Sequence, residues 1–296
     1  MSDERRGRRT VLVAGAAGAL GLRIASTLAK RGDRVIAAYR TERPDALAAL
    51  RAGGCTTLRL DLTDLAASAD AIAAADAAVL VPILAVSGPA ARAALCRAAP
   101  RLMLFSSNNV AVDFDSPVYA TLRAEEAALA RRAGAATVIR PTMIYGHAGD
   151  ASLSDLLRKA RRWPLLPVPG TGRALQQPIH VDDLAALAVH LLDSPPRERV
   201  VTAAGPDAVS LTALCQAAAR AVGRSPRIVV PLPPLAVVAR IAAGLGLRGP
   251  LSIDQLARIE RHKTPVGPTP TDWRPLIGLE EGLARLAREL GLAPSA

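Results

Sequence analysis

Three glycines at intervals of three residues, Gly15, Gly18 and Gly21, stand between an apolar run and an amphipathic run near the start of the chain. Glycine lets the backbone of such a turn approach a ligand closely, and the helix that follows presents the positive end of its dipole to an anion. A strand, this turn and a helix therefore predict a site for the pyrophosphate of a dinucleotide. The residues that we expect to contact it are Gly15, Ala17, Gly18, Ala19, Leu20 and Gly21.

The same stretch allows a second interpretation, as an export signal or a membrane anchor. Arg8 and Arg9 precede about twenty mostly small or apolar residues, close to the length of a spanning helix. The glycines and the polar pair Ser26 and Thr27 argue against a span, which would carry more Leu, Ile and Phe. We expect a cytoplasmic protein with no membrane association.

Charge and cysteine content restrict the partners. The net charge of +11 comes almost entirely from arginines spread along the chain, with no helix-turn-helix or zinc-finger pattern, so we expect a basic surface suited to an anionic cofactor and no nucleic acid. Cys55, Cys96 and Cys215 are isolated, which fits a reducing compartment and offers no disulfide framework. The four histidines show no ligand spacing, so we expect no metal site.

Apolar runs alternate with helical patterns through the first two thirds of the chain. This order implies right-handed crossovers and an α/β fold with a doubly wound parallel Rossmann sheet. The strands are short and apolar, as expected when helices cover both faces of the sheet. We expect strands at 10–14, 34–38, 56–60, 77–81, 101–106, 136–140 and 199–203, and helices at 19–31, 45–52, 64–75, 88–99, 117–133, 152–162 and 182–193.

The distribution of prolines and glycines predicts two domains. Residues 1–9 form an Arg-rich tail that we expect to be disordered. Residues 10–145 and 178–204 form the dinucleotide-binding domain, and residues 146–177 and 205–296 a smaller, mostly helical substrate lobe. The cleft between two such lobes is the default place for a substrate.

The tip of the second strand carries arginines where NAD enzymes carry an acid. An acid there binds the ribose 2′-hydroxyl of NAD. In this chain Arg40 and Arg43 follow the strand, and a guanidinium matches the geometry of a 2′-phosphate. The sequence therefore favours NADP(H) over NAD(H), with Glu42 as the residue that could still serve NAD.

Further motifs define a family resemblance. The fifth strand ends in Ser106, Ser107, Asn108 and Asn109, and Tyr119 follows twelve residues after Ser107. Together with RPTMIYG and PIHVDDLA, these motifs resemble the extended or atypical branch of the short-chain dehydrogenase/reductase superfamily. That branch includes the NAD(P)-dependent epimerase/dehydratase group and the NmrA-like proteins. The matching blocks span about residues 10 to 193.

The resemblance implies catalytic roles. Tyr119 corresponds to the general acid/base and Ser107 to the residue that holds the reacting oxygen. Members of this superfamily carry a lysine four residues after the tyrosine, which binds the nicotinamide ribose and lowers the tyrosine pKa; this chain has Arg123. We therefore assign Arg123 to both catalysis and cofactor binding, and the departure puts the usual triad in doubt. Tyr145, expected to face the cleft, is the alternative acid.

The resemblance also implies further contacts. Asp61 and Leu62 fall where the superfamily contacts adenine, although Asp61 could instead cap the following helix. Pro82 and Pro141, which follow the fourth and sixth strands, complete the expected cofactor contacts. Members of the superfamily often pair through the helices flanking the tyrosine, so the resemblance suggests a homodimer.

The segment before PIHVDDLA limits the substrate. The nucleotide-sugar epimerases that it resembles carry an arginine there that grips a diphosphate, whereas this chain has Gln176 and Gln177, with Arg173 as a partial substitute. We therefore expect a substrate other than a nucleotide sugar. The apolar pocket candidates Pro82, Ile83, Met143 and Leu165 to Val168 suggest a small, apolar substrate. The leading hypothesis is an NADP(H)-dependent oxidoreductase acting on a carbonyl, hydroxyl or conjugated double bond. The alternatives are an NAD-retaining epimerase or dehydratase and a non-catalytic NADP(H)-binding sensor or assembly protein.

Overall fold

The structure is a computed structural model in which the chain forms two compact units. The first comprises residues 1–141, 181–203 and 267–274, and the second residues 142–180, 204–266 and 275–296. Residues 267–274, which we expected in the substrate lobe, join the first unit because the Thr202 N–H donates to the Pro268 carbonyl at 2.7 Å. The structure describes residues 9–80, 101–112, 116–130, 135–150, 152–169, 171–232 and 261–294.

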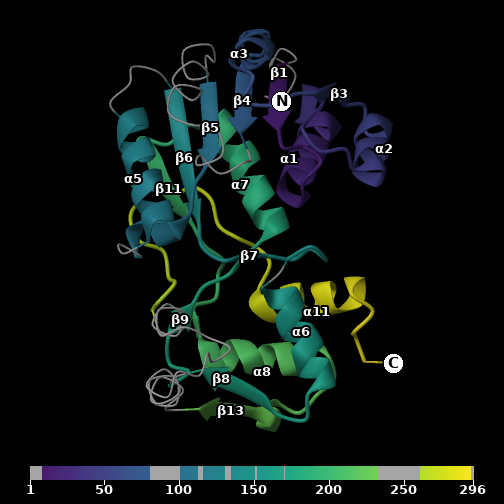
Figure 1. Ribbon diagram of the computed structural model, residues 1–296, viewed down its shortest axis with the longest axis vertical. Helices are drawn as coiled ribbons and strands as arrows, with labels where there is room; N and C mark the ends of the chain where they lie inside the picture. Colours follow the sequence, from purple (N-terminus) through teal and green to yellow (C-terminus); the bar gives the residue numbers. More distant parts are fainter. Residues whose placement is uncertain are drawn as a thin grey trace, which may run out of the picture. The chain divides into compact units, whose positions relative to one another are not determined.

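The first unit is built on a seven-stranded sheet in the order β11-β6-β5-β4-β1-β2-β3, in which every neighbouring pair is parallel (Figure 1). The chain runs outward from β1 in both directions, so the expected doubly wound α/β fold is confirmed. The strands are β1 (Thr10–Ala14), β2 (Arg34–Tyr39), β3 (Thr56–Arg59), β4 (Ala77–Leu80), β5 (Arg101–Phe105), β6 (Ala135–Pro141) and β11 (Val200–Ala203).

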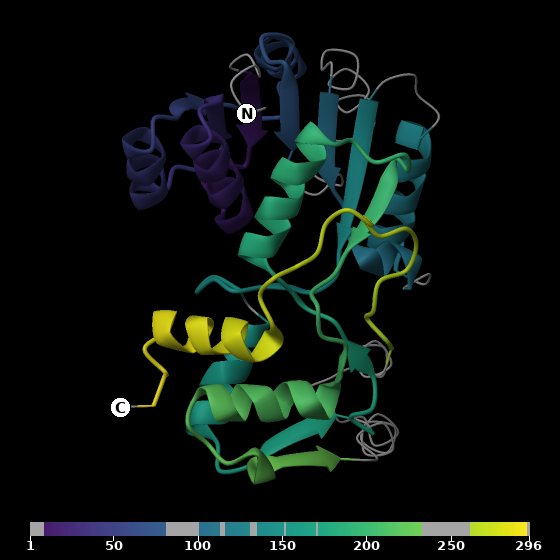
Figure 2. The same cartoon turned by 180° about the vertical axis from the view of Figure 1, so that it is seen from behind.

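Helices cover both faces of this sheet (Figures 1 and 2). On one face α1 packs against α7, and an ion pair joins Arg23 of α1 to Asp182 in the first turn of α7. On the other face Ile72 of α3 and Leu122 of α5 meet the alternating strand residues Leu12 and Leu104 in one buried cluster. The helices are α1 (Ala19–Lys30), α2 (Pro44–Ala52), α3 (Leu65–Ala73), α5 (Pro117–Ala130) and α7 (Val181–Asp193), with the short 3-10 helix η2 (Asn108–Ala111). The helix expected at 88–99 lies outside the described residues.

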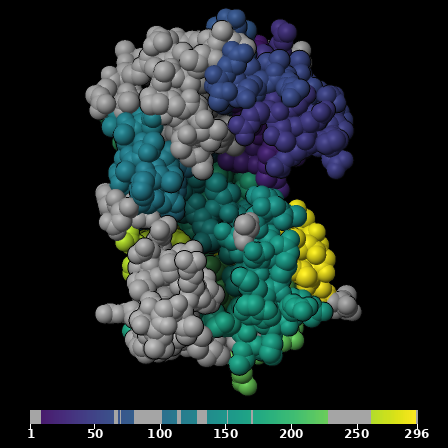
Figure 3. Space-filling view, viewed as in Figure 1, coloured from purple at the N-terminus to yellow at the C-terminus, as the bar shows by residue number. Residues whose placement is uncertain are grey.

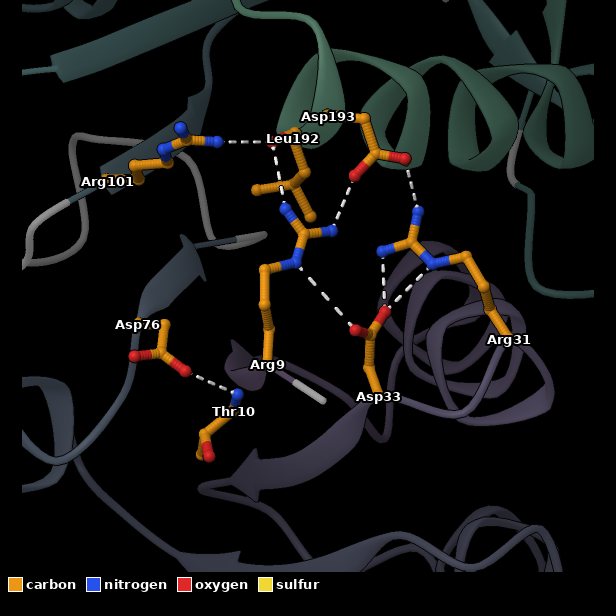
Figure 4. A network of polar contacts seen from close by, with 8 residues as sticks. All are labelled: Arg9, Thr10, Arg31, Asp33, Asp76, Arg101, Leu192 and Asp193. Atoms are coloured by element: carbon orange, nitrogen blue, oxygen red, sulfur yellow. Dashed lines mark hydrogen bonds and ion pairs between the residues drawn. The ribbon is translucent and has the colours of Figure 1, made fainter. Parts of the chain in front are cut away.

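A network of four alternating charges joins the carboxyl ends of α1 and α7 to the residues that precede β1 and β2 (Figure 4). Asp193, at the end of α7, accepts from Arg9 at 2.5 Å and from Arg31 at 2.6 Å. Asp33 accepts from Arg31 at 2.9 Å through Nε and lies 3.8 Å from Arg9. Arg9, which we assigned to a disordered tail, is therefore ordered by three partners: Asp193, Asp33 and the carbonyl of Leu192. The rest of the expected tail lies outside the described residues.

The second unit has a core of its own. Leu157 of α6, Ala218 of α8 and Leu283 of α11 belong to one buried cluster. In Figure 3, α11 (yellow) lies beside α6 on the surface of this unit. Its helices are α6 (Leu153–Arg162), α8 (Leu211–Ala221), η3 (Pro226–Ile228) and α11 (Leu279–Glu289).

The second unit also contains three two-stranded sheets where we expected loops and helices. The proline-rich stretch between Trp163 and Pro169 includes β8, which runs parallel to β13. Proline lacks an N–H, so it is tolerated in a sheet that consists only of edges. The pairs are β7 (Ile144–Tyr145) with β10 (Ile179–His180), β9 (Leu175–Gln176) with β12 (Val209–Ser210), and β8 (Leu166–Pro169) with β13 (Val229–Leu232).

Candidate functional site

The glycine turn has the geometry that a dinucleotide site requires. Gly15 adopts a left-handed conformation with φ of 78°, and its carbonyl accepts from the Gly18 N–H at 2.9 Å. Gly18 begins α1 without a side-chain cap, and the first turn of α1 contains no acid. The N-terminus of α1 is therefore suited to an anion.

A pocket of about 250 Å³ lies where the glycine turn meets the carboxyl ends of β1, β2 and β3. Ligands of open parallel sheets bind at this edge, near the point where the strand order reverses. Its lining contains two arginines, Arg40 and Arg43, and one acid, Asp61; Glu42 is not part of it. The residues that line it are Ala14, Gly15, Ala17, Gly18, Tyr39, Arg40, Thr41, Arg43, Leu60, Asp61, Leu62 and Thr63.

The single acid of this pocket is held by its own loop. Asp61 Oδ1 accepts from the Thr63 N–H at 3.0 Å and from the Thr63 hydroxyl at 2.8 Å. These bonds, with a smaller contribution from the charge of Arg40, keep the pKa of Asp61 below its ordinary value. Asp61 is therefore ionised in a turn that ends before α3 begins at Leu65, so it does not cap that helix.

Most of the expected cofactor contacts meet in this pocket. Ala19, Leu20 and Gly21 instead form the first turn of α1, and Pro141 ends β6. Pro82 lies outside the described residues. Thr41 and Thr63 also line the pocket and were not predicted from the sequence. For Thr63 the available signal was Asp61, because an aspartate often accepts from the backbone N–H two residues on.

Tyr119 and Ser107 are linked through Asn109. The Asn109 side-chain amide donates to the Tyr119 hydroxyl at 2.8 Å, and the Asn109 backbone N–H donates to the Ser107 hydroxyl at 3.3 Å. All three residues are half-buried, and the Tyr119 ring packs against the core of the first unit. The structure thus connects the two expected catalytic residues, Ser107 at the start of η2 and Tyr119 on α5, through one side chain. Asn109 was not singled out from the sequence; the polar pair after Ser107 was the available signal.

Arg123 makes a structural contact. Its guanidinium donates to the Val110 carbonyl at 2.9 Å, which ties α5 to η2. Val110 itself is 1% exposed and belongs to the core. Arg123 therefore helps to hold the segment that carries Asn109, in addition to lying one helical turn after Tyr119.

Tyr145 lies in the core of the second unit. It is 1% exposed, and its ring meets the His180 ring edge-on, with centroids 5.2 Å apart. A Cβ on Gly282 of α11 would overlap the Tyr145 hydroxyl. This burial argues against the alternative acid, because a proton donor must reach its substrate.

The glutamines that replace the diphosphate-gripping arginine are engaged elsewhere. Gln176 is 2% exposed, and its backbone belongs to β9. The Gln177 side chain donates to the Gly205 carbonyl at 2.7 Å. Neither side chain is thus presented as a diphosphate ligand. Within the described ranges, no group of three or more His, Cys, Asp or Glu side chains could hold a metal ion, and no helix is long and apolar enough to cross a membrane.

The sheet, the glycine turn and the pocket give the first unit a Rossmann-type fold, the class of fold that binds dinucleotides at this edge of the sheet. Residues 11–96 match the sequence model of the NAD dependent epimerase/dehydratase family. The resemblance to the extended short-chain dehydrogenase/reductases is thus confirmed over this segment. A comparison with curated proteins found no match.

Solved structures share the fold along nearly the whole chain. The dTDP-glucose 4,6-dehydratase of Bacillus anthracis, in complex with NAD, is 12% identical, with 96% of each chain covered and a TM-score of 0.69. MoeE5 in complex with UDP-glucuronic acid and NAD is 22% identical, with 96% of this chain and 99% of that chain covered and a TM-score of 0.68. The UDP-glucose 4-epimerase of Thermotoga maritima with UDP-glucose is 15% identical, with 95% and 98% covered and a TM-score of 0.67. At these identities the likeness establishes the fold alone.

Proposed function

We propose that this chain is an NADP(H)-dependent oxidoreductase acting on a carbonyl, hydroxyl or conjugated double bond of a small molecule. The observation that carries the proposal is the pocket at the ends of β2 and β3, where Arg40 and Arg43 flank the space beside the glycine turn. Two guanidinium groups match a 2′-phosphate, and Glu42 does not line the pocket.

The residues present fit the cofactor. The glycine turn and the uncapped N-terminus of α1 offer backbone N–H groups to a pyrophosphate, and the pocket of about 250 Å³ suits the adenosine half. When bound, the nicotinamide supplies or accepts a hydride. In this proposal Tyr119 donates or accepts the proton at its hydroxyl oxygen, and Ser107 orients the substrate oxygen.

The placement of the two glutamines supports a substrate other than a nucleotide sugar. Gln177 donates to the Gly205 carbonyl and Gln176 is buried, so neither side chain takes the place of the arginine that grips a diphosphate. The cation of this segment is Arg173, which is exposed. Arginine is the usual partner of a diphosphate because it can bind two oxygens at once. A small molecule without a diphosphate fits these residues better.

A second candidate is an epimerase or dehydratase that retains NAD and returns the hydride to its substrate. The family match of residues 11–96 favours it, as do the solved relatives in complex with NAD. The two candidates differ in cofactor preference and in cofactor exchange.

Titration of the tryptophan fluorescence of the purified protein with NADPH and with NADH tests the proposal. We expect NADPH to bind at least about tenfold more tightly, as one additional charge-assisted contact would give. Chromatography of the supernatant after denaturation shows whether NAD is retained from expression. Retained NAD together with a preference for NADH would favour the second candidate, and binding without turnover of any carbonyl or alcohol in a broad panel would indicate a non-catalytic protein.

A further inference from the structure

The hydroxyl of Tyr119 is bound by a neutral amide. The Asn109 Nδ2 donates to Tyr119 Oη at 2.8 Å, while the cationic side chain at the position of the family's lysine, Arg123, donates to a backbone carbonyl. The chain contains three lysines, Lys30, Lys159 and Lys263, and none lies near Tyr119 in the sequence. The hydrogen bond that the structure shows at the phenol oxygen therefore comes from Asn109.

We propose that Asn109 is the positioning residue for Tyr119, supplying at the phenol oxygen the stabilisation that a lysine supplies in the family pattern. This inference rests on the proposed function, in which Tyr119 transfers a proton. An N–H donor stabilises an oxyanion more than a neutral hydroxyl, because the oxyanion is the stronger acceptor. The Asn109 amide places such a donor at the phenol oxygen of Tyr119, and it fixes the direction in which the hydroxyl points.

The backbone around Asn109 is held on both sides. Ser107 caps η2, because its hydroxyl accepts from the Asn109 backbone N–H at 3.3 Å. On the other side Val110 is buried in the core, and its carbonyl accepts from Arg123 of α5. Since η2 and the helix that carries Tyr119 are joined by this bond, the amide and the phenol keep their geometry before any substrate arrives.

The same contacts give Arg123 a positioning role. Arg123 acts on Tyr119 through Val110 and Asn109, because its bond to the Val110 carbonyl keeps η2 beside α5. The departure from the family pattern at residue 123 and the role of Asn109 are therefore two parts of one arrangement.

Near-ultraviolet absorbance titration of tyrosinate tests the proposal on the full-length protein without cofactor. The chain has three tyrosines, and the difference between wild type and Tyr119→Phe isolates the Tyr119 signal. In Asn109→Ala we expect this signal to appear at a higher pH, because the donor is lost. In Asn109→Asp, which keeps the size of the side chain, we expect the signal to shift further toward high pH, because a carboxylate repels the phenolate.

Thr121→Ala is the matched control. Thr121 is exposed on the same helix, and its hydroxyl donates to the Pro117 carbonyl at 3.0 Å, so its loss should leave the Tyr119 signal unchanged. The proposal is overturned if Asn109→Ala and Asn109→Asp both titrate like the wild type, or if Asn109→Ala moves the signal to lower pH. Circular dichroism establishes whether each variant is folded. If Asn109→Ala does not fold, the titration of Asn109→Asp alone tests the proposal.

The pH dependence of kcat provides a second readout once a substrate is known. We expect the alkaline rise in the rate of alcohol oxidation to move with the absorbance signal in both Asn109 variants, and KM to change less than kcat. Failure of the proposed function is distinguishable from failure of this inference, because the titration needs neither cofactor nor turnover. A wild-type protein that turns over no substrate refutes the proposed function and leaves the titration to decide the role of Asn109.

Discussion

A side chain on Gly21 would overlap the carbonyl oxygen of Gly15 and lie 2.8 Å from its carbonyl carbon. The first turn of α1 therefore packs directly against the glycine turn, and no larger residue fits at this position. Gly18 differs, because a Cβ there would approach the same oxygen only to 3.2 Å. The effects of substituting the two glycines can thus be distinguished by experiment.

Replacing Gly21 by alanine should displace the glycine turn and weaken NADPH binding by about tenfold or more, because the pyrophosphate contacts depend on the backbone of this turn. Fluorescence titration measures the affinity, and thermal unfolding without cofactor measures the effect on the fold. Gly18→Ala is the control and should lose less affinity, since its neighbour needs to move only a few tenths of an ångström. Equal affinities for the two variants would contradict this account.

The first unit could be predicted in detail because its signals are local and repeated. Each expected strand from 10–14 to 199–203 is present, since short apolar runs followed by glycine or polar residues specify buried parallel strands. The glycine turn, Arg40 and Arg43 were predicted from their places at the ends of β1 and β2, whereas Asp61 and Leu62 were implied by the family resemblance. Thr63 was missed because its role depends on a bond to Asp61, which element order does not reveal.

The second unit could not be predicted in the same way, because long-range pairing decides its structure. β8 pairs with β13, about sixty residues later, and no local pattern reports such a partner. Tyr145 illustrates the same limit. Its position after the sixth strand suggested a cleft residue, whereas α11, near the end of the chain, covers it.

The contact between Tyr145 and Gly282 leads to a stability prediction. Gly282→Ala should lower the free energy of unfolding by about 1–3 kcal/mol, because the new methyl group overpacks a buried aromatic ring. The gain in helix propensity, about 1 kcal/mol at most, does not offset this. Tyr145→Phe in the same chain should restore part of the loss, since it removes the hydroxyl and leaves Cζ at 2.7 Å as the nearest obstacle.

Urea unfolding of both single variants and the double variant measures this coupling. Strictly additive effects would show that the two residues are not in contact. Tyr145→Phe alone should also retain turnover, in contrast to Tyr119→Phe, because the Tyr145 hydroxyl is buried.

Asp150 leads to a prediction about pH. It is 6% exposed and caps the start of α6, accepting from the Ser152 N–H at 2.7 Å. Burial nevertheless raises the pKa of Asp150 above its ordinary value of 3.8, against the effect of these bonds. Between the unfolded and the folded pKa the folded state binds more protons, so the contribution of Asp150 to stability falls as pH rises through that window.

Asp150→Asn keeps the acceptor and removes the charge. Its free energy of unfolding relative to wild type should therefore rise as pH increases from about 3.8 into the neutral range, and then level off. Asp150→Ala should show the same pH dependence but lie about 1 kcal/mol lower throughout, because the cap is lost. Urea unfolding across pH measures both curves, and a difference between Asp150→Asn and wild type that is flat or falls with pH would contradict the prediction.

The charge network at Asp193 should depend on salt. Asp193→Asn removes two ion pairs whose side chains are 18–31% exposed, so we expect a loss of about 1–2 kcal/mol that shrinks as ionic strength rises. Glu280→Gln is the control, because its pair with Arg220 is 46–61% exposed and should contribute little. Thermal unfolding at low and high salt measures the stability loss of each variant. Equal losses that do not depend on salt would contradict the prediction.

Arg40 should determine which nicotinamide cofactor this chain prefers. Arg40→Gln should weaken NADPH binding by about tenfold to a hundredfold, because a charge-assisted hydrogen bond to the 2′-phosphate is worth about 1.5–3 kcal/mol. NADH, which lacks that phosphate, should bind the variant nearly as well as it binds the wild type. Arg51→Gln is the matched control, since Arg51 is exposed on α2 and does not line the pocket. Fluorescence titration with both cofactors gives the four affinities, and equal weakening of NADPH and NADH by Arg40→Gln would show that Arg40 supports the pocket as a whole and does not select the phosphate.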